Sequence, residues 1–364
     1  MSKKKIAIVM AGGQSPSLWP RSRQDKPKQF LHFVGNGTLL QNTIDRILSI
    51  FPITDIYIAT TQDFVKLVQE QIPELPRKNI IVEPFPRHTL PCVSLAMTQL
   101  SLELEPDSVC VVFPSDHHIT NIGEFQSSVE IAMEFASTRD AIVAIGVTPT
   151  RPETNYGYIQ VDSLREGLGE FYDKGIRYSK AFAEKPDYEL AKKFLSTGEF
   201  LWNTGIFILK ISTFWNALYN CSQELYNYFN ILKRFVGRPQ FDQALLDTFR
   251  LIQSESFDTG IMERSGNVYV LESSFSWSDV GTWDEIYRLS LKDADNNHLV
   301  GDVIAIDVQN CFIQTDEKLI AAVGIRDLLV IDTHRALLIC KRGDSEKVPE
   351  IVNFLRRKNA NSLL

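Results

Sequence analysis

A cationic loop with two adjacent glycines stands near the beginning of the chain. It covers residues 11–30, reads AGGQSPSLWPRSRQDKPKQF and follows the short apolar run Ile6–Ala11. Gly12 and Gly13 would let backbone N–H groups approach a phosphate closely. The loop has neither the GKS or GKT ending of a Walker loop nor the GxGxxG spacing of dinucleotide-binding proteins. These residues alone fit either a phosphate-binding loop or an ordinary surface loop. The basic side chains are Arg21, Arg23, Lys26 and Lys28.

An aspartate follows a second apolar run. Asp116 stands just after the β-rich stretch Val109–Phe113. A carboxylate at this position could bind a hard cation, or it could cap a following helix. The neighbouring His117 and His118 do not indicate a zinc site, because adjacent side chains point in different directions and the sequence places no third ligand. We expect both histidines to be loop residues.

Short apolar runs alternate with helical patterns in the first half of the chain. This alternation predicts βαβ units with parallel strands covered on both faces. Ligands of such folds bind beyond the carboxyl ends of the strands, so the loops after Ala11, Val82 and Phe113 are the candidate sites. The predicted strands are Ile6–Ala11, Ile56–Thr60, Ile80–Val82, Val109–Phe113 and Ile142–Gly146. The predicted helices are Leu39–Ile50, one from about Asp63, Thr89–Leu104 and Glu124–Ser137.

The pattern changes after a polar stretch at residues 292–298, which we interpret as a linker. Beyond it, short strands with frequent turn residues predict a small all-β unit whose spacing suits the coils of a β-helix. These strands are Val303–Ile306, Cys311–Gln314, Leu319–Val323, Leu328–Ile331 and Ala336–Cys340, followed by a helix over Val348–Arg357. Before the linker we expect strands at Tyr156–Val161 and Ala181–Ala183 and helices at Asp187–Leu195, Phe214–Tyr228 and Trp283–Ser290.

Composition excludes several classes of protein. The 364 residues carry a formal net charge of −7, which argues against a general nucleic-acid-binding role. Five widely spaced cysteines without a CxxC pair argue against a disulfide framework or a structural zinc site. The run Ile6–Ala11 is too short for a signal-peptide core, and no stretch approaches the roughly 18 apolar residues of a membrane span. We therefore expect a reduced, cytoplasmic protein.

Eight motifs together resemble those of sugar-1-phosphate nucleotidyltransferases and, among them, the mannose-1-phosphate guanylyltransferases. The resemblance covers nearly the whole chain, and the motifs occur in the family's order. They are AGG…PKQF at 11–30, EPFPRHTLP at 83–91, FPSDHHI at 113–119, TRPETNYGYI at 150–159, FAEKPD at 182–187, LWNTGIF at 201–207, SFDTGIME at 256–263 and SWSDVGTWD at 276–284.

The resemblance implies a fold and a reaction. The implied fold is α/β: a Rossmann-like nucleotidyltransferase domain with a mixed central sheet over residues 1–290. A small C-terminal β-rich, β-helix-like domain over residues 291–364 would follow. The implied reaction transfers GMP from GTP to α-D-mannose 1-phosphate and gives GDP-mannose and pyrophosphate. Its partners would be these small molecules and Mg²⁺, without nucleic acid or membrane, and a homodimer is one open oligomeric state.

The resemblance also implies roles for individual residues. Asp116 and Asp279 would bind Mg²⁺, although a helix cap and a turn residue are their alternatives. Lys185 would contact the sugar phosphate, and its alternative is a lysine in a solvated Lys-Pro turn. Glu83 would bind the nucleotide, or it is only a carboxylate at a strand end. Asn203 would bind the sugar, or it is only a residue at the edge of the core. The catalytic candidates are Lys28, Lys185 and Asp116. The substrate- and nucleotide-binding candidates are Gly12, Gly13, Arg21, Arg23, Glu83, Gly157, Glu184 and Asn203.

The N-terminal loop departs from the family pattern. Ser15 replaces the third glycine, Ser17 replaces an arginine expected to contact the triphosphate, and Pro16 removes a backbone N–H donor. Three hypotheses follow. In the first, the chain is an active guanylyltransferase in which Arg21 or Arg23 reaches the phosphates. In the second, it is a weak or inactive paralogue that binds nucleotide or nucleotide-sugar and regulates an active partner. In the third, it is an enzyme with another base or hexose specificity.

Overall fold

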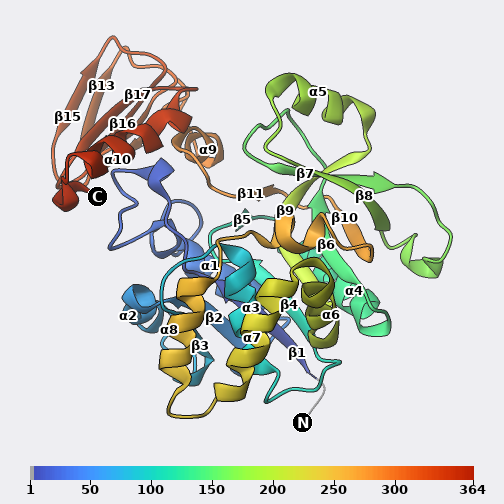
Figure 1. The fold of residues 1–364 in the computed structure, drawn as a ribbon. Coiled ribbons are helices and arrows are strands. Elements are labelled where there is room, and N and C mark those ends of the chain that lie inside the picture. Colours follow the sequence, from blue (N-terminus) through green and yellow to red (C-terminus); the bar gives the residue numbers. More distant parts are fainter. Residues whose placement is uncertain (1–3) are drawn as a thin grey trace. The chain divides into compact units, whose positions relative to one another are not determined.

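The computed structural model describes residues 4–364, which form two compact units (Figure 1). The first contains the chain up to Gly12 and residues 44–115 and 119–277, and the second contains residues 13–43, 116–118 and 278–364. The chain passes from one unit to the other after Gly12 and Ser115. It also does so within α1 (Leu39–Ile47) and within the short strands β5 (His118–Ile119) and β11 (Trp277–Ser278). The predicted domain boundary at residue 290 stays a prediction. None of the helices within residues 4–364 has the length and apolar character needed to cross a membrane.

A nine-stranded mixed sheet forms the centre of the first unit, in the order β3-β2-β1-β4-β9-β6-β10-β8-β7. The first four strands in this order are parallel, as the alternating pattern predicted. β9 runs antiparallel to both β4 and β6, so the central sheet is mixed, as the resemblance implied. The strands are β1 (Lys5–Met10), β2 (Ile56–Thr61), β3 (Ile80–Glu83), β4 (Val109–Pro114), β6 (Ile142–Val147), β7 (Gly157–Asp162), β8 (Ile176–Glu184), β9 (Phe200–Lys210) and β10 (Val268–Ser273).

Helices cover both faces of this sheet because its central strands are apolar on both sides. On one face, Ile8 and Phe207 share a core with α3, α6, α7 and α8. On the other face, Phe113 of β4 packs against Phe125 of α4, with ring centroids 6.2 Å apart. The helices are α2 (Val65–Gln71), α3 (Thr89–Leu100), α4 (Ile122–Thr138), α5 (Tyr188–Thr197), α6 (Ile211–Cys221), α7 (Gln223–Leu232) and α8 (Phe241–Leu251).

The helix expected over Phe214–Tyr228 and three further elements of this unit differ from the prediction. The single helix expected over Phe214–Tyr228 is two helices, because Ser222 leaves the helical conformation with φ −144° and ψ 71°. The strands β9 and β10 and the helix α8 were not predicted. β9 contains the WNTG motif, and Gly205 within it has φ +68°, so the strand lacks regular alternation there.

Parallel coils build the C-terminal part of the second unit. β12 pairs with β14 and β14 with β16 in parallel, β13 pairs in parallel with β15, and β17 closes the larger sheet antiparallel to β16. This arrangement confirms the β-helix-like expectation. The elements are α9 (Trp283–Leu289), β12 (His298–Val300), β13 (Val303–Ile306), β14 (Phe312–Gln314), β15 (Ile320–Val323), β16 (Leu328–Asp332), β17 (Leu337–Lys341) and α10 (Val348–Arg357).

The N-terminal loop belongs to the core of this second unit. Leu18 and Trp19 are buried in one cluster with Trp283 of α9 and Val352 of α10. Trp283 Nε1 donates a hydrogen bond to the Trp19 carbonyl at 2.9 Å. Apolar burial of this kind contributes about 25 cal/mol per Å². The loop is therefore held by residues more than 250 positions later in the sequence.

Candidate functional site

Lys28 connects two of the predicted site aspartates. Its Nζ lies 3.0 Å from Asp116 Oδ2 and donates to the Asp279 carbonyl at 2.8 Å and to the Val280 carbonyl at 3.4 Å. Lys28 is only 7% exposed, so its charge depends on these partners. Burial would raise the pKa of the Asp116 carboxyl, but Lys28, with a smaller contribution from His117, holds that pKa below its usual value. The structure thus brings Lys28, Asp116 and Asp279 together, and we call them the Lys28 cluster.

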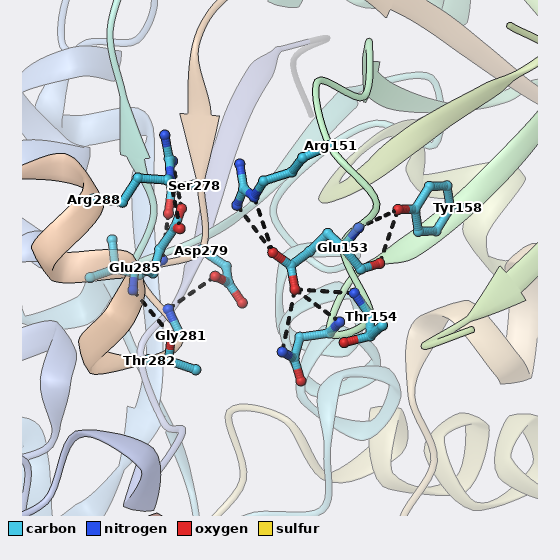
Figure 2. Close-up of polar contacts among 12 residues, drawn as sticks. Arg151, Glu153, Thr154, Tyr158, Ser278, Asp279, Gly281, Thr282, Glu285 and Arg288 are labelled. Atoms are coloured by element: carbon cyan, nitrogen blue, oxygen red, sulfur yellow. Dashed lines mark hydrogen bonds and ion pairs between the residues drawn. The ribbon is translucent and has the colours of Figure 1, made fainter. Parts of the chain in front are cut away.

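A strained turn presents Asp279 (Figure 2). Val280 has φ +50°, a left-handed conformation that is rare for a β-branched residue. Asp279 Oδ1 accepts from the Gly281 N–H at 3.0 Å, and a Cβ at Gly281 would lie 2.8 Å from Asp279 Oδ2. Thr282 then caps α9 by accepting from the Glu285 N–H. Glycine at 281 is therefore needed for the aspartate to fold back over the turn.

The donor set of the Lys28 cluster fits a hard cation. Mg²⁺ prefers oxygen ligands and is commonly held by one or two carboxylates together with substrate phosphates, and the cluster offers two carboxylates. Residues 4–364 contain no group of three or more His, Cys, Asp or Glu side chains that could hold a metal without a substrate. The remaining ligands of a cation held by these two carboxylates would be water molecules or atoms of a bound molecule.

Glu83, at the end of β3, lies beside Gly12. A Cβ at Gly12 would be 3.6 Å from Glu83 Oε1, while a Cβ at Gly13 would meet no atom within 4 Å. The Gly13 carbonyl accepts from Gln29 Nε2 at 2.9 Å. Glu83 is 3% exposed, and this burial raises the pKa of its carboxyl to about 7, with a hydrogen bond to Cys92 opposing the shift. Glu83 is therefore a buried carboxyl beside the Gly12 backbone, with Cys92 as a hydrogen-bond partner.

We expect Glu83 to make the stability of the protein depend on pH. The folded state keeps the Glu83 proton up to about pH 7, whereas the unfolded state loses it near pH 4.5. Stability should therefore decrease as the pH rises through this window, by up to about 3 kcal/mol at pH 8. Glu83→Gln should remove this loss. Urea unfolding at pH 5 and pH 8 measures it, and the exposed Glu130→Gln is the control. Equal pH dependence in wild type and Glu83→Gln would contradict the assignment.

A second group of predicted residues gathers in the first unit around the end of β8. Gly157 pairs with Glu184 across β7 and β8, and a Cβ at Gly157 would lie 2.8 Å from Glu184 Oε2. Partial burial and then Asp258 raise the pKa of the Glu184 carboxyl, and Lys185 partly offsets them. Lys185 itself is exposed and has φ +46°. The glycine thus makes room for a carboxylate, and a strained backbone presents the adjacent lysine to solvent.

Asn203 of β9 completes this group, but its amide is already engaged. Its Nδ2 donates to Asp258 Oδ1 at 2.6 Å, and its Oδ1 accepts from the Gly205 N–H at 3.0 Å. Asp258 begins a π-helical turn (Asp258–Met262), a feature often found at functional sites. Sequence reasoning assigned no role to Asp258, although the motif SFDTGIME contains it. We call Gly157, Glu184, Lys185, Asn203 and Asp258 the Glu184 cluster.

The turn before β7 is held by Glu153, another residue without a predicted role (Figure 2). Its carboxylate pairs with Arg151 at 3.2 Å and accepts from the Thr154 N–H at 3.1 Å. The Tyr158 hydroxyl donates to the Glu153 carbonyl and accepts from the Glu153 N–H, both at 2.9 Å. These contacts fix the segment that leads to Gly157. The motif TRPETNYGYI is the sequence signal that could have shown it.

The two predicted loop arginines have contacts within the second unit. The Arg21 guanidinium lies 5.9 Å from the centre of the Phe33 ring. Arg23 Nε donates to the Pro20 carbonyl at 3.0 Å, and its Nη1 donates to the Ser362 carbonyl at 3.4 Å. Ser17 lies between the buried Leu18 and Pro16, in a short 3-10 turn (Pro16–Leu18). The arginine missing at position 17 is therefore not replaced by a residue of that turn.

Known proteins share both parts of this architecture. Residues 6–296 match the family described as Nucleotidyl transferase, and residues 301–355 match the MannoseP isomerase/GMP-like beta-helix domain. Mannose-1-phosphate guanylyltransferases of Klebsiella pneumoniae and Escherichia coli are 34% and 33% identical to this chain. Each similarity covers 97% of this chain and 74% of the relative. The chain belongs to the mannose-1-phosphate guanylyltransferase family.

Membership of the mannose-1-phosphate guanylyltransferase family confirms the resemblance and the fold class inferred from the motifs. A crystal structure from Thermus thermophilus, described as mannose-1-phosphate geranyltransferase, has a TM-score of 0.83 and 28% identity. It covers 97% of this chain and 99% of its own. The chain spans about three quarters of the length of its guanylyltransferase relatives.

Proposed function

We propose that this chain transfers GMP from GTP to α-D-mannose 1-phosphate. Its family membership supports this reaction, and the buried Lys28 is the structural observation that carries the proposal. A phosphate oxygen of the sugar phosphate attacks the α-phosphorus of GTP. The bond from that phosphorus to the bridging oxygen breaks, and pyrophosphate leaves. The attacking phosphate is largely dianionic near neutral pH, so the reaction requires positioning and charge neutralisation rather than a general base.

The proposal assigns the reacting groups to the residues predicted from the sequence. Asp116 and Asp279 would hold Mg²⁺, which when bound would neutralise negative charge on the triphosphate. Lys28 orients both aspartates through its contacts with the Asp116 carboxylate and the Asp279 carbonyl. Lys185 would bind the sugar phosphate. The proposed nucleotide-binding residues are Gly12, Gly13, Arg21, Arg23 and Glu83, and the proposed sugar-binding residues are Gly157, Glu184 and Asn203.

The wider setting follows from the same proposal. We propose a cytoplasmic location for the enzyme. Its net charge of −7 argues against nucleic acid or an anionic membrane as a partner, so we propose GTP and mannose 1-phosphate as its partners. A homodimer stays a prediction, as does the functional division at residue 290.

A turnover assay with all four nucleoside triphosphates tests the proposal. The protein is incubated with Mg²⁺, mannose 1-phosphate and each triphosphate in turn, and pyrophosphate release is measured. Release with GTP alone supports the proposed reaction. Release with another triphosphate would show that the enzyme transfers a different nucleotide and would contradict the proposed reaction. Tight binding of GDP-mannose without turnover would instead support a regulatory paralogue. That function is the second candidate because Ser17 replaces the arginine of the family pattern.

Lys185→Ala should weaken use of the sugar phosphate more than binding of GTP. A charge-assisted contact with phosphate contributes about 1.5–3 kcal/mol, so we expect kcat/KM for mannose 1-phosphate to decrease by about 10²-fold. GTP affinity, measured without sugar phosphate, should stay unchanged. Lys192→Ala, at an exposed position of α5, is the matched control. An equal loss of GTP binding would indicate general damage to the loop and contradict the assigned role.

A further inference from the structure

Asp258 is hydrogen-bonded to another member of the Glu184 cluster, Asn203. Its Oδ1 accepts from Asn203 Nδ2 at 2.6 Å. Burial raises the pKa of the Asp258 carboxyl, although the hydrogen bond from Asn203 opposes this shift. The fold therefore keeps an aspartate where its ionised form is disfavoured, which is common at functional sites. No substrate contact of the proposed reaction uses Asp258, so its position requires another explanation.

Two contacts fix the orientation of the Asn203 amide. Its Nδ2 faces the Asp258 carboxylate, and its Oδ1 accepts from the Gly205 N–H at 3.0 Å. The reversed amide would place an oxygen against the carboxylate and an NH2 group against an N–H donor, and both pairs repel. The second N–H of Nδ2 donates to no acceptor within residues 4–364. Asp258 therefore holds Asn203 so that one donor with a defined direction is left for a ligand.

This donor lies beside the bare backbone of Gly157. A Cβ at Gly157 would be 3.7 Å from Asn203 Nδ2 and 2.8 Å from Glu184 Oε2. Asn203 is half-buried and Glu184 is exposed, so a ligand can reach both side chains. A fixed donor and a carboxylate acceptor thus flank one glycine. Two adjacent hydroxyl groups of a hexose match this arrangement, because one can donate to the carboxylate while the other accepts from the amide.

The π-helical turn that carries the aspartate is held by helix α3. The Phe257 N–H donates to Thr89 Oγ1 at 2.8 Å, and the Leu90 N–H donates to the Glu255 carbonyl at 3.1 Å. Gly260 packs so closely against the Leu90 side chain that a Cβ there would require a shift. The turn therefore has a fixed place in the first unit, and so has the carboxylate that it presents to the amide.

We propose that Asp258 is a positioning residue for sugar recognition. It holds the Asn203 amide so that this amide donates to one sugar hydroxyl while Glu184 accepts from the neighbouring hydroxyl. Asp258 acts through Asn203 and does not itself contact the sugar. The inference rests on the proposed function, since it states how the proposed sugar-binding residues recognise their ligand. The recognised feature is a pair of adjacent hydroxyl groups, separate from the phosphate that Lys185 would bind.

Binding of GDP-mannose and of GDP to the whole protein separates the contribution of the sugar from that of the nucleotide. Each is titrated calorimetrically, without GTP or mannose 1-phosphate. Asp258→Ala should weaken binding of GDP-mannose about fivefold, as expected for one hydrogen bond, and leave binding of GDP unchanged. Asp258→Asn should bind GDP-mannose within about twofold of the wild type, because its amide oxygen can still accept from Asn203. Asp242→Ala, at an exposed position of α8, is the matched control and should change neither affinity.

Steady-state kinetics gives a second result. Asp258→Ala should raise KM for mannose 1-phosphate about fivefold and leave kcat nearly unchanged, because a contact with a remote hydroxyl acts equally in the ground state and the transition state.

The positioning role is overturned if Asp258→Ala binds GDP-mannose as the wild type does or loses GDP binding to the same extent. It is also overturned if Asp258→Asn loses as much as Asp258→Ala, or if the wild type binds GDP-mannose no more tightly than GDP. The titrations need no turnover, so a wild type that releases no pyrophosphate would contradict the proposed reaction alone.

Discussion

Lys28→Met should lower kcat/KM for nucleotidyl transfer by at least about 10³-fold, because it removes a buried cation that positions both candidate metal ligands. Methionine preserves much of the packing volume but leaves the Asp116 carboxylate without its cation and two carbonyl groups without a donor. The Asp116 side chain is 27% exposed, so we expect a stability loss of about 2–3 kcal/mol, smaller than for a fully buried pair. Steady-state kinetics and thermal unfolding measure the two effects.

Lys26→Met is the matched control, because Lys26 is an exposed lysine of the same loop. It should change stability by less than about 0.5 kcal/mol. If both variants kept full activity and stability, the central role of Lys28 would be wrong. A stable Lys28→Met protein without activity would separate the catalytic from the structural contribution.

Restoring the family pattern of the N-terminal loop should increase turnover by about 10²-fold, because an arginine at position 17 would add a fixed cation with five donors. The tested variant is Ser15→Gly, Pro16→Thr and Ser17→Arg. Ser15 has φ −130° and ψ 81°, which does not require glycine, so we expect Ser17→Arg alone to give most of the gain. Pyrophosphate release under saturating GTP is the measurement.

Arg21→Ala and Arg23→Ala distinguish the remaining hypotheses. If one of these arginines has replaced the missing one, its removal should abolish activity and the restored loop should give little gain. A binding-only paralogue should show no turnover with any of these changes while it still binds ligand. Native turnover that is insensitive to all of them would refute the importance of the loop departure.

The sequence predicted local structure well where periodicity is regular. The helix over Val348–Arg357 is observed with the same bounds, and the parallel strands β1 to β4 follow the predicted apolar runs. The direction of β9 was not predictable, because an apolar strand buried on both faces has the same pattern whether it runs parallel or antiparallel. The break at Ser222 has no glycine or proline as a local signal.

The candidate site was predictable only in part. Motifs identified Lys28, Asp116 and Asp279 separately, but the contact between Lys28 and the Asp279 carbonyl joins residues 251 positions apart, which no spacing rule can reveal. Asp258 was missed because its partner, the Asn203 amide, comes from a strand that was itself not predicted. Side-chain contacts across distant segments are set by tertiary packing, and local pattern carries little information about them.

The N-terminal loop depends on residues that the ribosome makes much later. Trp19 Nε1 donates to the Leu363 carbonyl at 2.7 Å across a separation of 344 residues. At about 5–20 residues per second, roughly 20–70 s pass between the synthesis of these two positions. During this time Leu18 and Trp19 lack the α10 side chains that bury them. A nascent chain stalled before residue 345 would therefore expose an apolar loop to chaperones and proteases, and completion of the loop is a late step in the maturation of the protein.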